Sequence, residues 1–197
     1  MLTAGANRVV SLDLHNDSIQ GFFDIPVDCL TVGPLFARHI KSLNIPDLTV
    51  VSPDHGGVKR ARDMGVRLDC PIAVIDKRRA KANECEAMFI LGDVKDKNVV
   101  IVDDICDTCG TLVAASKMLK DNGAKNIYVA VTHGVLSGDA IEKVENSDIS
   151  KLFISDTIPL KKQSDKIEVI SITEMLGEII QAISDETSVG HVYDMFN

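Results

Sequence analysis

The stretch that decides the fold is VVIVDDICDTCGT, which occupies residues 99–111. It begins with four consecutive β-branched residues and turns polar at Asp103 and Asp104. An apolar run without alternation is typical of a strand that is covered on both faces, as strands are in parallel sheets. A second run of this kind, IYVAV, follows at residues 127–131. The two runs therefore predict strands inside a sheet that has helices on both sides.

The segment between these two strands has the spacing of a helix. Residues 111–122 place Leu112, Ala115 and Leu119 on one face and end before Gly123, a residue suited to the C′ position. Similar short runs predict further strands. Together, the candidate strands span residues 8–12, 48–52, 71–75, 98–102, 126–132, 151–155 and 167–171. Strands that alternate with helices indicate an α/β fold, a mostly parallel sheet flanked by helices with right-handed crossovers.

A final helix is expected near the C-terminus. The pattern Ser171-x-x-Glu174 predicts a capping box at its start. The apolar residues that follow at helical spacing, and that are expected to form one buried face, are Leu176, Ile179, Ile180 and Ile183. The sequence contains no internal repeat, low-complexity tract or linker, so we expect residues 1–197 to form a single domain.

The composition limits the classes of partner. The chain has 197 residues, 45% hydrophobic and 25% charged, with a net charge of −8. An acidic chain is a poor general nucleic-acid binder, because that affinity rests on Lys and Arg neutralising phosphates. No apolar run approaches the roughly 20 residues needed to cross a membrane. We therefore expect a soluble, cytoplasmic protein with neither nucleic-acid nor membrane partners.

The polar part of the first-quoted stretch has the chemistry of a sugar-phosphate site. The Thr108 and Thr111 hydroxyls, with backbone N–H groups at a helix N-terminus and Gly110 for close approach, can bind a phosphate. Carboxylates directly before such a loop would repel a phosphate alone, but they suit a ligand that also carries hydroxyls. The alternative interpretation is a strand-to-helix turn in which these side chains only cap the helix.

Residues 99–111 resemble the phosphoribosyl-diphosphate-binding motif of type I phosphoribosyltransferases and ribose-phosphate diphosphokinases. The resemblance implies a type I phosphoribosyltransferase-like fold, with two acids that contact ribose hydroxyls and a loop that holds the 5-phosphate. The substrate-binding residues it predicts are Asp103, Asp104, Asp107, Thr108, Cys109, Gly110 and Thr111. Cys109 stands where many members have Gly.

The cysteines give no disulfide framework, since there are five of them without a typical spacing. Cys106 and Cys109 form one CxxC, but a zinc site would need a second pair of ligands. A redox pair would lie at a helix start after a strand, which is where these two are expected. Because the resemblance already accounts for this loop, we interpret the CxxC as accidental.

Residues 13–28, DLHNDSIQGFFDIPVD, are similar to the signature of ribose-phosphate diphosphokinases, which nucleobase transferases lack. At a strand end, Asp13 and His15 would share one face, since i and i+2 do so. A carboxylate and an imidazole there could hold a divalent ion and its phosphates. The resemblance implies Mg²⁺ as cofactor, with His15 also binding the metal-borne phosphates. The predicted metal ligands are Asp13, His15, Asp24, Asp28 and Asp54.

Two further segments fit the same family. SPDHGG at residues 52–57 resembles the family's SPD-x-GG element, whose Asp joins the histidine at magnesium; the alternative is a glycine-rich turn with an Asx cap. The basic run at residues 75–83 resembles the loop that closes over the triphosphate, and the resemblance implies that Lys77 and Arg79 are catalytic; the alternative is a solvated loop, as most charge runs are. Cations beside a phosphoryl group in transfer stabilise its developing charge.

The resemblance covers the whole chain but not the whole family protein, so we expect these residues to be its C-terminal portion, without the N-terminal half and inactive alone. The activity implied is transfer of the diphosphoryl group of ATP to ribose 5-phosphate, in a homo-oligomer. The alternative is the non-catalytic, regulatory associated subunit of the same enzyme. A phosphoribosyltransferase would leave residues 13–28 unexplained.

Overall fold

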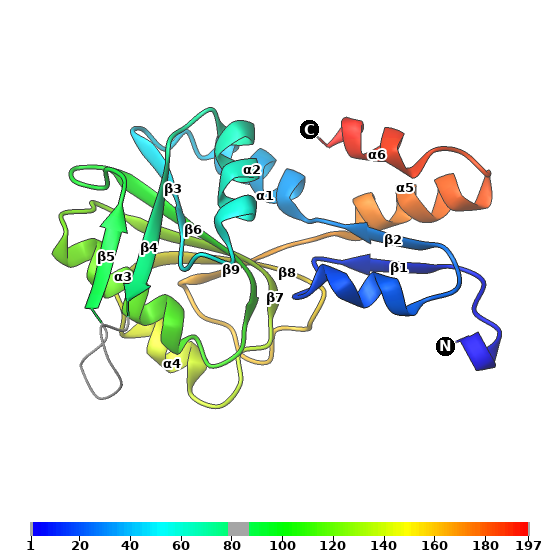
Figure 1. The fold of residues 1–197 in the computed structure, drawn as a ribbon. Coiled ribbons are helices and arrows are strands. Elements are labelled where there is room, and N and C mark those ends of the chain that lie inside the picture. The colour runs from blue at the N-terminus through cyan, green and yellow to red at the C-terminus, as the bar shows by residue number, and fades with distance from the viewer. Residues whose placement is uncertain (1, 79–86, 197) are drawn as a thin grey trace.

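The computed structural model describes residues 2–78 and 87–196, and its centre is a seven-stranded sheet of order β5-β4-β3-β6-β7-β8-β9 (Figure 1). All neighbouring strands are parallel except β4 and β5, which pair antiparallel at one edge. The strands are β3 (Leu48–Ser52), β4 (Ile72–Arg78), β5 (Ala87–Leu91), β6 (Asn98–Cys106), β7 (Ile127–Gly134), β8 (Ile149–Ser155) and β9 (Ile167–Ile170). The prediction of a mostly parallel α/β sheet is confirmed.

Helices cover both faces of this sheet. The helices are α1 (Gly33–Ser42), α2 (Val58–Leu68), α3 (Gly110–Asp121), α4 (Ala140–Glu145), α5 (Thr173–Ser184) and α6 (Val189–Met195). Buried side chains of α3 and α4 belong to one hydrophobic cluster, and those of α1, α2, α5 and α6 belong to another. No helix among the described residues is long and apolar enough to cross a membrane.

The strand β6 shows why the decisive stretch is apolar throughout. Val99 and Ile101 belong to one of the two clusters, while Val100 and Val102 belong to the other. Successive side chains of a strand point to opposite faces, so a strand between two helical layers buries every position. β6 continues to Cys106, four residues beyond the predicted end, because the residues after Val102 still pair with β7.

A small second sheet extends to one side of the main sheet (Figure 1). It consists of β1 (Val9–Leu12) and β2 (Val27–Leu30), which pair in parallel. The 3₁₀ helix η2 (Asp17–Phe22) connects them, and η1 (Leu2–Ala4) precedes β1. Two strands, β2 and β5, were not among the predicted ones.

The capping box predicted for the last long helix is wrong. The N-cap of α5 is Ile172, and no side chain caps it. The Ser171 hydroxyl instead donates to Asp156 Oδ2 at 2.6 Å and accepts from the Thr173 amide at 3.2 Å. Asp156 Oδ1, from the connection between β8 and β9, also accepts from the Ile172 amide at 2.9 Å, so this carboxylate binds the residues just before α5.

The buried face of α5 also differs from the predicted one. Its fully buried residues are Met175, Ile179 and Ala182, which repeat at i, i+4 and i+7. Ile180 is 59% exposed although it was expected to be buried. Ile179 is buried, and Leu176 and Ile183 are partly buried against the same cluster, so of the four predicted residues only Ile180 lies outside the buried face.

Candidate functional site

The two carboxylates at the end of β6 lie against a cation from a neighbouring helix. Arg60, in the first turn of α2, reaches Asp103 Oδ1 with Nη1 at 3.2 Å and Asp104 Oδ2 with Nη2 at 3.4 Å. His15, which follows β1, lies with Nδ1 2.9 Å from the same Asp104 oxygen. Asp104 is only 3% exposed, whereas the His15 side chain is 82% exposed. A buried carboxylate thus holds together three segments that are far apart in sequence.

The two neighbouring carboxyl groups have different affinities for a proton. The pKa of Asp103 is raised to about 7 by burial, by the hydrogen bond with Asp104 and by the like charge of Asp104. The positive charge of Arg60 acts in the opposite direction and lowers it. Burial opposes ionisation of Asp104 too, but hydrogen bonds from Asp103 and His15 and the charge of Arg60 hold its pKa below the usual range. Near neutral pH the pair therefore carries between one and two negative charges.

The residues of the 13–28 segment are not placed as expected. β1 ends at Leu12, and Asp13 has a left-handed backbone with φ 41°, so Asp13 and His15 do not share one face of a continuous strand. Asp13 Oδ2 accepts from the Val32 amide at 2.9 Å and from the Thr132 hydroxyl at 2.7 Å. This carboxylate joins the first strand to the main sheet.

The SPDHGG turn between β3 and α2 follows the Asx-turn alternative. Asp54 Oδ1 accepts from the Gly57 amide at 2.9 Å, and the Ser52 hydroxyl donates to the Asp54 carbonyl at 2.6 Å. A Cβ at Gly57 would lie 2.8 Å from Ser52 Oγ, so a larger residue there would displace the Ser52 hydroxyl from this turn. His55 Nε2 lies 2.7 Å from Oδ1 of Asp76 on β4.

The five predicted metal ligands are not brought together. Asp28 pairs with Arg8, whose Nε lies 2.6 Å from its Oδ2, while Asp24 is exposed. Within residues 2–78 and 87–196, no three His, Cys, Asp or Glu side chains are arranged to hold a metal ion. His15 offers at most a partial site, and Mg²⁺ commonly completes such sites with water and substrate phosphates. The metal roles of these residues remain a prediction.

The predicted phosphate loop joins β6 to α3. Asp107 and Thr108 are exposed, and α3 begins at Gly110 with Cys109 as N-cap at φ 57°. No side chain in the described chain caps this helix, so its first amides can receive an anion. The sequence thus placed the loop correctly, although Thr111 lies one residue inside the helix rather than at its start.

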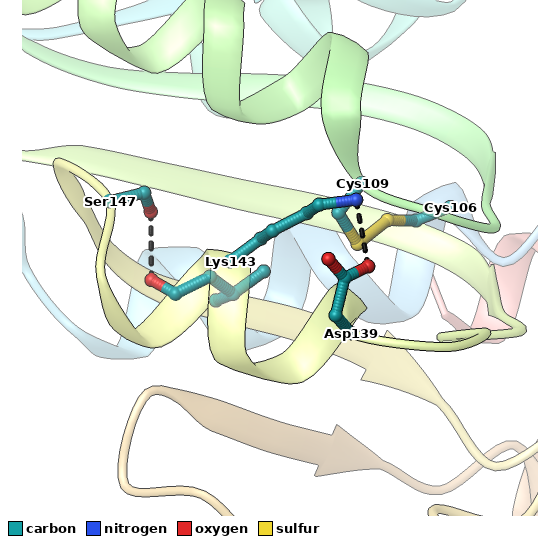
Figure 2. Close-up of a disulfide and its surroundings, with 6 residues drawn as sticks. Cys106, Cys109, Asp139, Lys143 and Ser147 are labelled. Carbon is teal, nitrogen blue, oxygen red and sulfur yellow. Dashed lines mark hydrogen bonds and ion pairs between the residues drawn. A yellow bond between two sulfur atoms is a disulfide. The ribbon is translucent and has the colours of Figure 1, made fainter.

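The cysteine interpretation is corrected. Cys106 and Cys109 are joined by a disulfide, with their Cα atoms 5.3 Å apart (Figure 2). The CxxC is therefore a bonded pair and not an accident of the loop. Cys29 and Cys70 are free, whereas Cys85 lies outside the described residues.

A cavity of about 600 Å³ opens beside His15 and Arg60, between the small sheet and α2. Its wall carries both signs of charge and includes Asp13, His15, Lys59, Arg60, Asp63 and Arg67. Lys77 belongs to β4 and pairs with Met88 of β5 in the sheet register. Arg79, the other predicted catalytic residue, lies outside the described residues.

Comparison with known proteins places these features in a family. The model of the phosphoribosyl synthetase-associated domain matches residues 78–194, more than half of the chain. The chain belongs to this family. A ribose-phosphate pyrophosphokinase of Oceanobacillus iheyensis is 49% identical over 193 residues, which are 97% of this chain and 61% of the relative. One from Caldanaerobacter subterraneus is 50% identical over 193 residues, or 96% of this chain and 61% of the relative.

Solved structures agree with the family assignment. The phosphoribosylpyrophosphate synthetase of Mycobacterium smegmatis has a TM-score of 0.86 at 36% identity, over 94% of this chain and 61% of that chain. The adenine phosphoribosyltransferase of Giardia lamblia, at a TM-score of 0.50 and 16% identity, covers 70% of this chain and 76% of that one and shares the fold alone. The chain therefore spans about three fifths of the synthetases it matches in this family.

Sequence reasoning missed Arg60 and Asp76. Arg60 follows Gly57 by three residues, so its place in the first helical turn after a strand could have suggested that it faces the strand ends. Asp76 directly precedes the predicted Lys77, but nothing in its local sequence indicates a histidine partner 21 residues away.

Proposed function

We propose that this chain takes part in making 5-phosphoribosyl 1-diphosphate and AMP from ATP and ribose 5-phosphate, as a transferase of nucleotide biosynthesis. The observation that carries the proposal is the pair of the buried Asp104 and the partly buried Asp103 at the end of β6, followed after a short loop by an uncapped helix N-terminus. The two features offer hydroxyl acceptors and a phosphate site side by side on one short segment. The names of the relatives, ribose-phosphate pyrophosphokinase, favour the enzyme over the associated regulatory subunit.

In this proposal, the carboxylates of Asp103 and Asp104 accept hydrogen bonds from the ribose hydroxyls. Charge-assisted bonds of this kind are stronger than neutral ones, and Arg60 keeps Asp104 ionised to accept them. The 5-phosphate binds the first amides of α3 and the hydroxyls of Thr108 and Thr111. The sugar is then held at both ends, which fixes its 1-hydroxyl for attack on the β-phosphorus of ATP, with AMP leaving.

The diphosphoryl side depends on cations. We propose that Mg²⁺ is carried to the site on ATP, where it would neutralise phosphate charge when bound, with His15 contacting the complex. His15 Nδ1 is engaged by Asp104, which leaves Nε2 as its ligand atom. Asp13, Asp24, Asp28 and Asp54 stay in the predicted ligand set, but hydrogen bonds already occupy one oxygen of Asp13 and of Asp54 and both oxygens of Asp28.

Catalysis itself is assigned to Lys77 and Arg79. Their cationic groups would stabilise the transferring diphosphoryl group, whose charge grows in the transition state. Lys77 is the second-last residue of β4. The residue before it, Asp76, contacts His55 of the SPDHGG turn. This places the start of the basic segment at the same edge of the sheet as Asp103 and Asp104.

We further propose a cytoplasmic homo-oligomer in which residues 1–197 are the C-terminal part of the functional unit. Phe22, which is 84% exposed, and Ile19, which is 43% exposed, are apolar surface that a second subunit could cover. Sedimentation of the purified chain tests the assembly. ³¹P NMR with ATP, Mg²⁺ and ribose 5-phosphate tests whether residues 1–197 catalyse the transfer alone: we expect ribose 5-phosphate to bind but no AMP to accumulate.

The sugar site has a direct test. Asp104→Asn should weaken ribose 5-phosphate binding about tenfold in calorimetry, since it loses a charge-assisted acceptor. The matched control is Asp121→Asn, at the exposed end of α3, where the carboxylate is 3.8 Å from Lys117 Nζ. Equal affinity of Asp104→Asn and the unchanged chain would mean that the acids serve only to organise the strand end.

A further inference from the structure

The Cys106–Cys109 disulfide closes the loop assigned to the 5-phosphate. Cys106 is the last residue of β6, and Cys109 is the N-cap of α3, so only Asp107 and Thr108 lie between the bonded residues (Figure 2). The bond thus ties the end of the central strand to the start of the helix whose amides would bind the anion. Any change in this bond acts on the ends of the loop directly.

The sulfur atoms lie beneath an exposed loop. Cys106 is 2% exposed and Cys109 is 4% exposed, and both belong to the core cluster that contains Leu112 and Leu136. The β7–α4 connection lies against the same loop, since the Leu136 amide donates to the Cys106 carbonyl at 3.1 Å. A reagent therefore reaches the disulfide only when the short, solvent-facing segment above it opens.

We propose that Cys106 and Cys109 form a reversible thiol–disulfide exchange site, and that its redox state sets the order of residues 107–112, which are the loop and the first turn of α3. The reductant is a dithiol. Its thiolate attacks one sulfur of the pair, and the other cysteine leaves as a thiolate. The second thiolate of the reagent then closes a ring disulfide, releasing the first cysteine. Two electrons pass to the protein, the two cysteines gain two protons, and the dithiol becomes a disulfide.

Reduction should loosen the loop because two constraints are lost together. The covalent link between strand and helix becomes a contact between two thiols. Cys109 is also held at φ 57°, a conformation that residues with a Cβ rarely adopt, and without the link it can relax. A disulfide in a cytosolic protein is usually transient and redox-sensing, which agrees with the proposed location.

The effect of the disulfide on the affinity for ribose 5-phosphate rests on the proposed function. A loop that is already ordered loses less conformational entropy when it binds a ligand, so the oxidised chain should bind ribose 5-phosphate more tightly than the reduced chain. By linkage, bound ribose 5-phosphate must favour the disulfide by the same factor. We expect about five- to twenty-fold, within the usual range for coupled sites.

The experiment follows the redox state and the loop separately. The purified 197-residue chain is equilibrated with mixtures of reduced and oxidised dithiothreitol, alkylated and mapped by peptide mass. Amide hydrogen exchange is measured in the oxidised and reduced forms, and ribose 5-phosphate binding is measured by calorimetry in both. We expect a two-electron titration confined to Cys106 and Cys109, faster exchange at residues 107–112 after reduction, and weaker sugar-phosphate binding.

Matched variants separate the causes. Cys106→Ala should fix the loop in its reduced behaviour and abolish every response to dithiothreitol, whereas Cys70→Ala, a change at a free cysteine, should keep the full response. Should Cys106→Ala fail to fold, the chemically reduced chain gives the same comparison.

The outcomes are distinguishable. Two thiols that never pair under oxidising conditions, or exchange at residues 107–112 that ignores reduction, overturn the redox site. Redox-dependent exchange without ribose 5-phosphate binding in either form supports the redox site and refutes the proposed function. Equal affinity of both forms, with unchanged exchange, leaves the sugar site intact and refutes the coupling.

Discussion

Replacing Asp103 by Asn should change how the stability of the chain depends on pH. The pKa of Asp103 is raised to about 7 from an ordinary 3.8, first because of burial and then because of Asp104. A raised pKa means that the folded chain holds this proton more tightly than the unfolded chain. The associated stability is therefore complete below about pH 4 and is lost as the pH rises through about 7. Asp104, whose pKa is lowered, changes only below this window.

The magnitude follows from the shift. About three pKa units correspond to at most roughly 4 kcal/mol, at 1.36 kcal/mol per unit. The Asp103 side chain is 22% exposed and shares its proton with a neighbour, and both effects reduce the shift. We therefore expect Asp103→Asn to be more stable than the unchanged chain by about 1–3 kcal/mol near pH 8, and nearly equal to it near pH 4.5.

Urea unfolding followed by circular dichroism, from about pH 4.5 to pH 8, measures this difference. Asp121→Asn, on the exposed end of α3, is the matched control and should run parallel to the unchanged chain across the range. A constant difference between Asp103→Asn and the unchanged chain at every pH would refute the reasoning, because the variant cannot then have removed a titrating group.

Two further predictions concern packing and catalysis. Gly134→Ala should cost about 1–3 kcal/mol in thermal unfolding, because its Cβ would lie 2.9 Å from two methyl carbons of the buried Ile154. Gly177→Ala, in an exposed turn of α5 with nothing within 4 Å, should instead stabilise by about 0.5–1 kcal/mol, and the opposite order would be inconsistent with these contacts. In a full-length synthetase containing this chain, the proposed function predicts that Lys77→Ala and Arg79→Ala should each lower turnover at least about a hundredfold with little change in KM for ribose 5-phosphate, since the two cations would act on the transition state. Steady-state kinetics with unchanged turnover in both would remove the catalytic assignment.

The fold was predictable where burial on two faces left its mark on the sequence. β6 and β7 were found because helical layers cover both faces and their central residues, 99–102 and 127–131, form unbroken apolar runs. β5 was missed although its residues, AMFIL at 87–91, are apolar throughout; as an antiparallel edge strand it leaves Phe89 53% exposed and Leu91 51% exposed. The cap of α5 was missed because Asp156, 15 residues before Ser171, competes for its hydroxyl.

The site was predictable in its composition but not in its contacts. The pattern of residues 99–111 located the acids and the loop, because both are local to one strand–helix junction. The role of Asp13 was not predictable, since the hydroxyl that it accepts from belongs to Thr132, 119 residues away. The partners of a carboxylate depend on which strands meet at the sheet edge, and this becomes known only when the topology is known.

The protonation of Asp103 and Asp104 explains how a phosphate could bind the proposed loop although two acids precede it. Two ionised carboxylates would repel the incoming phosphate, yet the raised pKa of Asp103 leaves that group partly protonated near neutral pH. The guanidinium of Arg60 lies within 3.4 Å of both groups, so it offsets most of the charge that remains. Asp104 keeps its charge because His15 and Arg60 both contact it. In the proposed function, Asp104 would then accept from a sugar hydroxyl as a carboxylate while Asp103 adds little repulsion. The two carboxylates share Arg60 and a hydrogen bond with each other, so the contact that distinguishes Asp104 is the one with His15.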